Sequence, residues 1–197
     1  MRRMSRLCSD DCRILLDLAR RAISSAVIEK RILDSPPYSA ALTEPAGAFV
    51  TLHRDGQLRG CVGQVESPDS LGDTVARAAI SAALHDSRFP AVEADEVRSL
   101  EIEISVLSPP EPVTPEAIQL GRHGLLIVKG EYRGLLLPQV ATERRWSSQR
   151  FLEETCAKAG LPRDAWREPS TRVLAFAAEV FSDTSLRVGH FARMERA

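Results

Sequence analysis

"GAFVTLHRDGQLRGCVG", residues 47–63, predicts two β-strands joined by a tight turn. Residues 49–52 favour the pleated conformation of a first strand, and Asp55-Gly56 is a strong signal for a two-residue hairpin turn. Strands joined by such a turn are antiparallel. We therefore expect an antiparallel sheet, with the segment LRGCVG, residues 58–63, at the exit of the second strand.

Helices are predicted on both sides of this hairpin. Ser9 or Asp10 can cap a first helix, which ends before Pro36-Pro37. Its apolar residues at helical spacing are Ile14, Leu15, Leu18, Ala22 and Ala26. A second helix opens with a capping pattern from Ser70 to Asp73. Its apolar stripe, in which small alanines imply close packing, consists of Leu71, Val75, Ala78, Ala79 and Ala82.

The strand that follows is predicted at LEIEISVL, residues 100–107, because apolar and polar side chains alternate there. Ile102, Ile104 and Val106 form the apolar side of the alternation, and Glu101, Glu103 and Ser105 form the polar side. We therefore expect one face of this strand to be in contact with water.

The rest of the chain predicts a second hairpin between helices. Residues 114–121 suggest a short helix with a threonine cap and a proline at its first position. Residues 124–140 predict a hairpin that turns near residues 129–131 and ends at Pro138-Gln139. Residues 147–162 predict a helix capped by Ser147 or Ser148, and residues 171–181 a closing strand. This pattern favours an α/β fold of the α+β type, a two-lobed single unit with antiparallel sheets and β-hairpins covered by helices.

Composition narrows the class of protein. The 197 residues are 44% hydrophobic, which is enough for one domain or two intimate lobes. A net charge of −1 disfavours a nucleic-acid partner. No secretory signal and no membrane-spanning run is apparent, so we expect a cytoplasmic protein with free thiols and no membrane partner. No phosphate-binding loop, dinucleotide motif or metal-ligand spacing is seen, and we expect neither a cofactor nor a metal.

The candidate catalytic residues centre on Cys61. A thiol beside a cation or a protonated histidine can act as a nucleophile, and His85 or His123 could serve. Glu103 or Glu101 could orient such a histidine. The alternative is structural: Cys61 packs at a strand end, His85 closes its helix, and His123 is a turn residue.

The candidate ligand-binding residues surround the same cysteine. They are Arg59, Gly60, Gly63, Arg88, Pro138 and Gln139. The glycines would let a ligand approach the backbone, the arginines would bind an anion, and Gln139 would offer amide hydrogen bonds. Arg88 could equally pair with Asp86 or Asp95.

Several segments together resemble a known family. They are GAFVTL, LRGCVG, AISAALHDSRFP, LEIEISVLSPPEP, GRHGLLI, RGLLLPQVA, FLEETCAKAGLP and FAAEVF, with Trp146 and Trp166. In this order and spacing the chain resembles the AMMECR-domain family, named for the Alport, midface hypoplasia and elliptocytosis chromosomal region protein. Bacterial and archaeal members are called AmmeMemoRadiSam system protein A. The likeness covers residues 10–181 and leaves residues 182–197 as a C-terminal tail.

The resemblance implies a larger and a smaller lobe, a cleft near residues 58–63, and association with a Memo-like protein and a radical-SAM protein. It implies no particular reaction. Two functions are therefore expected as alternatives: a thiol-dependent enzyme acting with these partners, or a non-catalytic binding module for a peptide or small acidic ligand.

Overall fold

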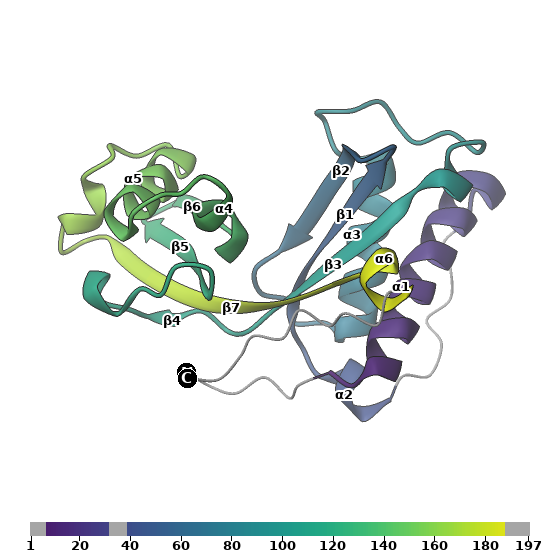
Figure 1. The fold of residues 1–197 in the computed structure, drawn as a ribbon, viewed down its shortest axis with the longest axis horizontal. Helices are drawn as coiled ribbons and strands as arrows, with labels where there is room; N and C mark the ends of the chain where they lie inside the picture. Colours follow the sequence, from purple (N-terminus) through teal and green to yellow (C-terminus); the bar gives the residue numbers. More distant parts are fainter. Residues whose placement is uncertain (1–6, 32–38, 188–197) are drawn as a thin grey trace. The chain divides into compact units, whose positions relative to one another are not determined.

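The computed structural model describes residues 7–31 and 39–187 and divides the chain into two compact units (Figure 1). Among the described residues, the larger unit consists of residues 7–31, 39–107 and 179–187, and the smaller unit consists of residues 108–178. Each unit has its own hydrophobic core. Pro36, Pro37 and residues 188–197 of the expected tail lie outside the described residues. The mixture of helices and antiparallel strands confirms the expected fold class.

The first helix of the larger unit, α1 (Ser9–Ser24), continues into a π-helical turn, η1 (Ser25–Glu29). The expected cap at Ser9 or Asp10 is wrong, by one and by two residues respectively. Cys8 is the N-cap: its sulfur accepts a hydrogen bond from the Asp11 N–H, while the Asp11 carboxylate accepts one from the Cys8 N–H. Sulfur is not among the usual capping acceptors, so residue type alone does not point to it. Ile14, expected in the buried stripe, is 45% exposed.

The second expected helix is confirmed as α3 (Leu71–Leu84), with the Ser70 side chain accepting from the Asp73 N–H. All five residues of its expected apolar stripe are buried. A short helix, α2 (Ala40–Thr43), precedes the first strand. Helices α1 and α3 pack against each other and against the strands of this unit, and their buried residues share one core with the strands (Figure 1).

The sheet of the larger unit places β2 (Gln57–Gln64) at its edge, β1 (Gly47–Arg54) next, and then β3 (Glu101–Leu107). The expected hairpin turn is confirmed: Asp55 and Gly56 both have positive φ, 52° and 73°, as a type I′ turn requires. A register shift between Leu52 and His53 inserts one extra residue, Arg59, into β2. The bulge changes which β2 residues lie opposite β1.

The alternation predicted for β3 is confirmed on one face only. Ile102, Ile104 and Val106 are buried, as expected. On the opposite face Glu101 is exposed and Glu103 is half-buried, but Ser105 is 2% exposed. The face of β3 that was expected to contact water is therefore exposed to solvent only at the start of the strand. A 3-10 turn, η2 (Val97–Ser99), leads into β3. A short helix, α6 (Asp183–Arg187), follows the last strand of the chain.

The smaller unit contains the second hairpin, β5 (His123–Lys129) and β6 (Tyr132–Leu136), paired as expected. On its other side β5 pairs with β7 (Arg172–Ser182), which also pairs with the short β4 (Glu111–Pro112). Two 3-10 turns, η3 (Pro115–Ala117) and η4 (Ala165–Arg167), complete the unit; η3 replaces the expected short helix and has no side-chain cap.

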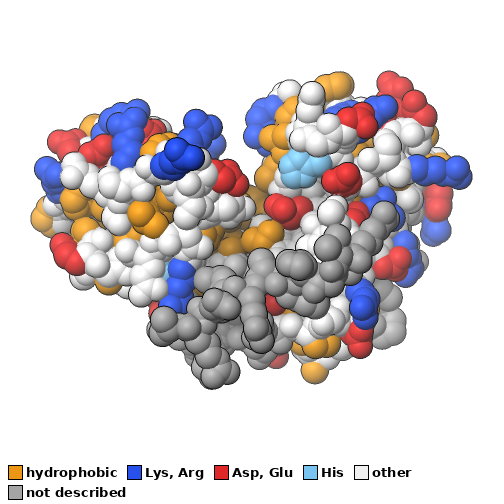
Figure 2. Space-filling model, viewed as in Figure 1, with side chains coloured by type: hydrophobic (Ala, Val, Ile, Leu, Met, Phe, Trp, Pro, Cys, Tyr) orange, Lys and Arg blue, Asp and Glu red, His pale blue; other side chains and the backbone are white. Residues whose placement is uncertain are grey.

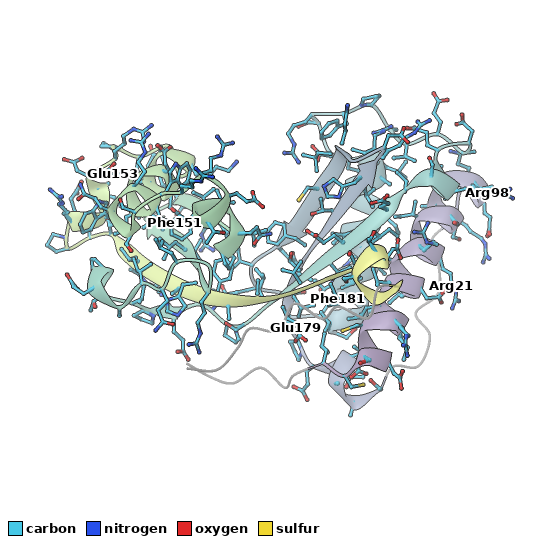
Figure 3. The ribbon with its side chains drawn as sticks, in the orientation of Figure 1. Arg21, Arg98, Phe151, Glu153, Glu179 and Phe181 are labelled. Atoms are coloured by element: carbon cyan, nitrogen blue, oxygen red, sulfur yellow. The ribbon has the colours of Figure 1, made fainter. Side chains whose placement is uncertain are left out.

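Two helices cover this hairpin. α5 (Ser148–Lys158) is capped by Ser147, one of the two expected residues, and carries Phe151 into the core (Figure 3). α4 (Pro138–Glu143) was not predicted and begins at the proline expected to end the hairpin. Proline suits the first turn of a helix because the N–H it lacks would have no partner there. Phe181, beyond the smaller unit's share of β7, is buried in the core of the larger unit (Figure 3).

Within the described ranges no helix has both the length and the apolar character needed to cross a membrane. On the face of the larger unit seen in Figure 2, basic and acidic side chains are interspersed.

Candidate functional site

Cys61 lies in the middle of the edge strand β2, and its outward backbone groups are paired by side chains. Its N–H donates to Asp86 Oδ2 at 2.8 Å, and its carbonyl accepts from Arg88 Nη2 at 3.2 Å. Asp86 and Arg88 thus occupy positions that a neighbouring strand would fill. Covering an edge in this way prevents unwanted strand pairing and holds the cysteine backbone in place.

The Cys61 side chain is half-buried, and a hydroxyl group points at its sulfur. Thr51 Oγ1 donates to Cys61 Sγ at 3.3 Å. Thr51 lies directly opposite Cys61 on β1, and Glu103 lies opposite Thr51 on β3. Since paired residues in antiparallel strands share a face, these three side chains form a row. The row belongs to the opposite face from Val50 and Leu52, which pack in the core with α1 and α3.

Asp86 and Arg88 form a two-point ion pair. Arg88 Nε and Nη2 bond the two carboxylate oxygens at 2.9 and 2.7 Å, and the Arg88 guanidinium lies 5.4 Å from the centre of the Phe89 ring. The hydrogen bonds from Arg88 hold the pKa of the Asp86 carboxyl well below its usual range. The alternative that Arg88 pairs with Asp86 is confirmed.

The Arg59 guanidinium donates its hydrogen bonds to groups of the protein itself. Its Nε and Nη2 bond both oxygens of Glu96 at 2.9 Å each, and its Nη1 and Nη2 reach the carbonyls of Pro90 and Ala91. The hydrogen bonds from Arg59 lower the pKa of Glu96 to about 2, with smaller contributions from the Glu93 N–H and from Arg54. Arg59 therefore anchors the loop after α3, and the expectation that it offers a planar cation to a ligand loses its basis.

The two glycines beside Cys61 are explained by packing. A Cβ on Gly60 would lie 2.1 Å from the carbonyl oxygen of Ala82 in α3, and one on Gly63 would lie 2.2 Å from the carbonyl oxygen of Ala48. Real Cβ atoms do not approach so closely, so each glycine makes room for a neighbouring backbone. The space expected for a ligand at Gly60 is occupied by the helix.

The two histidines proposed as bases have separate structural surroundings. His85 is exposed at the C-cap of α3, where its N–H donates to the Ser81 carbonyl. His123 belongs to the smaller unit and is buried; its Nδ1 accepts from the Gln119 N–H at 3.3 Å. Burial, and then the charge of Arg122, lower the pKa of His123, which favours the neutral imidazole. The expectation of a turn residue is wrong, because His123 begins strand β5 and lies opposite Ala177 on β7.

The structure therefore gathers part of the expected set. Cys61, Glu103, Arg59, Gly60, Gly63, Arg88 and His85 belong to the larger unit. His123, Pro138 and Gln139 belong to the smaller unit, where Pro138 is buried and Gln139 is half-buried in the first turn of α4. In the described segments no group of three or more His, Cys, Asp or Glu side chains could hold a metal ion.

Thr51 is the residue that sequence reasoning missed. The turn at Asp55-Gly56 alone would pair Arg54 with Gln57 and, counting back, Thr51 with Gly60. The bulge moves Cys61 into that position. The interruption at Arg59 carries no distinctive sequence signal, so the contact between Thr51 and Cys61 could not have been read from spacing.

Comparison with known proteins gives one consistent result. A family model described as AMMECR1 matches residues 16–181. Protein TK0174 of Thermococcus kodakarensis is 45% identical over 181 residues, covering 86% of this chain and 88% of the relative. A protein of Methanothermobacter thermautotrophicus is 43% identical over 185 residues, covering 90% and 96%. The crystal structure of the uncharacterized protein PH0010 from Pyrococcus horikoshii superposes with a TM-score of 0.82 at 41% identity, covering 88% of this chain and 92% of that one.

Proposed function

The chain belongs to the AMMECR1 family, and from that premise we propose that it carries a thiol-dependent site in which Cys61 attacks an electrophilic substrate. The observation that carries the proposal is the surroundings of the sulfur. Cys61 is half-exposed on a strand whose backbone is fixed on both sides, and the Thr51 hydroxyl donates to Sγ.

The groups around the sulfur suit a nucleophile. A thiolate, not a thiol, is the attacking species, so donors and cations next to sulfur favour attack. Thr51 supplies a donor. Arg88 supplies a cation: besides the dominant hydrogen bonds to Asp86, the side chain of Cys61 contributes to raising the pKa of Arg88. A rigid strand also keeps the sulfur in one place, which lowers the cost of orienting the reacting atoms.

The other three thiols provide internal references. Cys12 and Cys156 are buried, and burial raises the pKa of Cys12 to about 12 and raises that of Cys156 as well. Cys8 is exposed at the start of α1. If exposure alone controlled reactivity, Cys8 would react before Cys61.

The test is site-resolved alkylation of the folded protein. With about one equivalent of iodoacetamide at pH 7, we expect the first label on Cys61, ahead of Cys8, as read by peptide mass spectrometry. Cys8→Ser should leave the labelling rate at Cys61 unchanged, and Cys61→Ser should abolish the fast phase. Faster labelling of Cys8 than of Cys61 would show that Cys61 is a packing residue.

A second candidate is a non-catalytic docking site for a peptide or small acidic ligand. It is favoured by one observation: across the described residues, no histidine forms a hydrogen bond to Cys61, so the nucleophile lacks an evident histidine base. On this alternative, the Cys61 segment would only bind a partner. Cys61→Ser would then bind as tightly as wild type, and a bulky Cys61→Trp would block binding.

The partners belong to the proposal as well. The family resemblance suggests a Memo-like protein and a radical-SAM protein, and the natural measurement is calorimetric titration of each purified partner with wild type and with both Cys61 variants. A thiol-dependent enzyme predicts that turnover in the assembled mixture disappears in Cys61→Ser while binding persists. Turnover that survives in Cys61→Ser would contradict the proposal.

A further inference from the structure

Arg88 combines a fixed position with exposure to solvent. Its side chain is 54% exposed, while its partner Asp86 is 6% exposed. The position of the guanidinium is defined by three contacts: the two-point pair with Asp86, the hydrogen bond to the Cys61 carbonyl, and the Phe89 ring. A preorganised guanidinium loses little conformational freedom when it binds an anion.

Among the described residues, part of this guanidinium donates no hydrogen bond to an oxygen. A guanidinium has five N–H hydrogens. In the described part of the chain, Nε and one Nη2 hydrogen face Asp86, and the other Nη2 hydrogen faces the Cys61 carbonyl, so three are used. The two hydrogens on Nη1 donate to no oxygen of the described residues, and the interaction of Arg88 with the Cys61 side chain places the guanidinium near the sulfur.

Arg59 differs from Arg88 in its exposure and in how many of its nitrogens are bonded within the protein. The Arg59 side chain is 14% exposed, and its Nε, Nη1 and Nη2 are all bonded to Glu96 or to loop carbonyls. Arg59 cannot reach out to a ligand without giving up these bonds. Of the two arginines that the sequence suggested as anion binders, Arg88 is therefore the one that retains this capacity.

We propose that the Cys61 site selects electrophiles that carry an oxyanion, and that Arg88 Nη1 binds this oxyanion beside the sulfur. The inference rests on the proposed thiol-dependent function and adds the chemical class of the substrate. Guanidinium binds carboxylate and phosphate alike, so the shared chemistry is an oxyanion close to the electrophilic carbon.

Iodoacetate is the matching probe, because it places a carboxylate next to its reactive carbon, and iodoacetamide is the neutral comparison. In both reactions the Cys61 sulfur forms the new S–C bond and the C–I bond breaks. Iodide leaves with the electron pair of that bond, and the thiol proton goes to solvent. The two reagents therefore differ in charge while sharing the bond changes.

The experiment uses the full chain with Cys8→Ser, so that a single accessible thiol remains to be followed. Rate constants at Cys61 are measured with both reagents at constant ionic strength, together with those of a small free thiol. We expect the iodoacetate to iodoacetamide ratio at Cys61 to exceed that of the free thiol by roughly tenfold, as one charge-assisted hydrogen bond would give. A ratio equal to that of the free thiol would overturn the inference.

Variants separate Arg88 from general electrostatics. Arg88→Gln should return the ratio to that of the free thiol. The matched control is Arg77→Gln, since Arg77 on α3 is 58% exposed and also pairs with an aspartate, Asp69. It should leave the ratio unchanged; an equal drop in both variants would contradict a specific role for Arg88.

Two further readouts complete the test. Acetate and inorganic phosphate are added as competitors: protection by acetate identifies a carboxylate site, protection by phosphate identifies a phosphate site, and protection by neither contradicts the inference. Failure of the proposed function gives a different result, because Cys61 would then resist both reagents, in the wild type as in Arg88→Gln.

Discussion

At the scale of single residues, two buried carboxylates organise the surroundings of Cys61. Asp86 accepts from the Cys61 N–H and from the backbone and side chain of Arg88. Glu96 accepts from Arg59, from Arg54 and from the Glu93 N–H. Each carboxylate is surrounded by donors, which offsets the cost of removing its charge from water. The loop after α3 is thereby fixed against the edge of β2.

The first prediction concerns Asp86. Asp86→Asn keeps the shape of the side chain but removes the negative charge that accepts hydrogen bonds from the Cys61 N–H and from the Arg88 guanidinium. We expect a loss of about 2 kcal/mol of unfolding free energy in urea, typical for breaking hydrogen bonds to a buried charge. The control is Asp55→Asn at the hairpin tip, where the side chain is 89% exposed and asparagine tolerates positive φ. Equal stabilities of the two variants would contradict this role of Asp86.

The second prediction concerns Glu96 and pH. Because its pKa is about 2 in the folded protein and ordinary in the unfolded chain, the folded state binds the proton more weakly. The resulting stabilisation is present above the unfolded pKa of about 4.5 and is lost as pH falls toward about 2. Glu96→Gln cannot titrate, so the stability advantage of wild type over this variant should shrink across that window. Parallel stability curves from pH 6 to pH 2 would disprove it.

At the scale of elements, the two hairpins use the same packing device. In β2, Gly60 follows Arg59 and receives the backbone of Ala82 in α3. In β6, Gly134 follows Arg133, and a Cβ there would lie 2.3 Å from the nitrogen of Ala159, the C-cap of α5. In each unit, then, a glycine in the second strand of a hairpin lets the end of a helix rest on the sheet. An Arg-Gly pair thus stands at the point of close packing in both hairpins.

The third prediction follows from that packing. Gly60→Ala and Gly134→Ala should each destabilise the protein by roughly 1–3 kcal/mol, the usual cost of overfilling a tight contact. The control is Gln64→Ala, an exposed position on the same strand as Gly60. The midpoints of urea unfolding provide the measurement. A Gly60→Ala variant as stable as Gln64→Ala would show that α3 moves away from β2 at little cost.

The elements also show where sequence reasoning succeeds and where it stops. Turns and caps with a local chemical cause were predicted well, as at Asp55-Gly56, at Ser70 and at Ser147. Features decided by tertiary contacts were not. The bulge at Arg59, the burial of Ser105 and the sulfur cap at Cys8 depend on neighbours that local patterns do not specify. For the candidate site, the sequence points to Cys61 and Arg88 as hypotheses, whereas the contact from Thr51 and the bonds that hold Arg59 within the protein follow from tertiary structure alone.

At the scale of the whole molecule, the four thiols are distributed over two separate cores and the surface. Cys12 lies in the core of the larger unit and Cys156 in that of the smaller unit, at 1% and 0% exposure. Cys8 and Cys61 are accessible. The fourth prediction is that excess Ellman's reagent titrates two thiols in the native protein and four after unfolding in guanidinium chloride. More than two in the native state would show that one of the cores opens under native conditions.

The central claim is that the sulfur of Cys61 is made reactive by the groups that hold it, and Thr51 offers the most direct test. In the Cys8→Ser background, the alkylation rate of Cys61 by iodoacetamide at pH 7 is compared among wild type, Thr51→Val and Thr51→Ser. Valine keeps the shape of threonine without the hydroxyl, and serine keeps the hydroxyl. We predict a rate roughly 3- to 10-fold lower for Thr51→Val, the equivalent of one hydrogen bond, and a near wild-type rate for Thr51→Ser. Equal rates in all three proteins would contradict the claim.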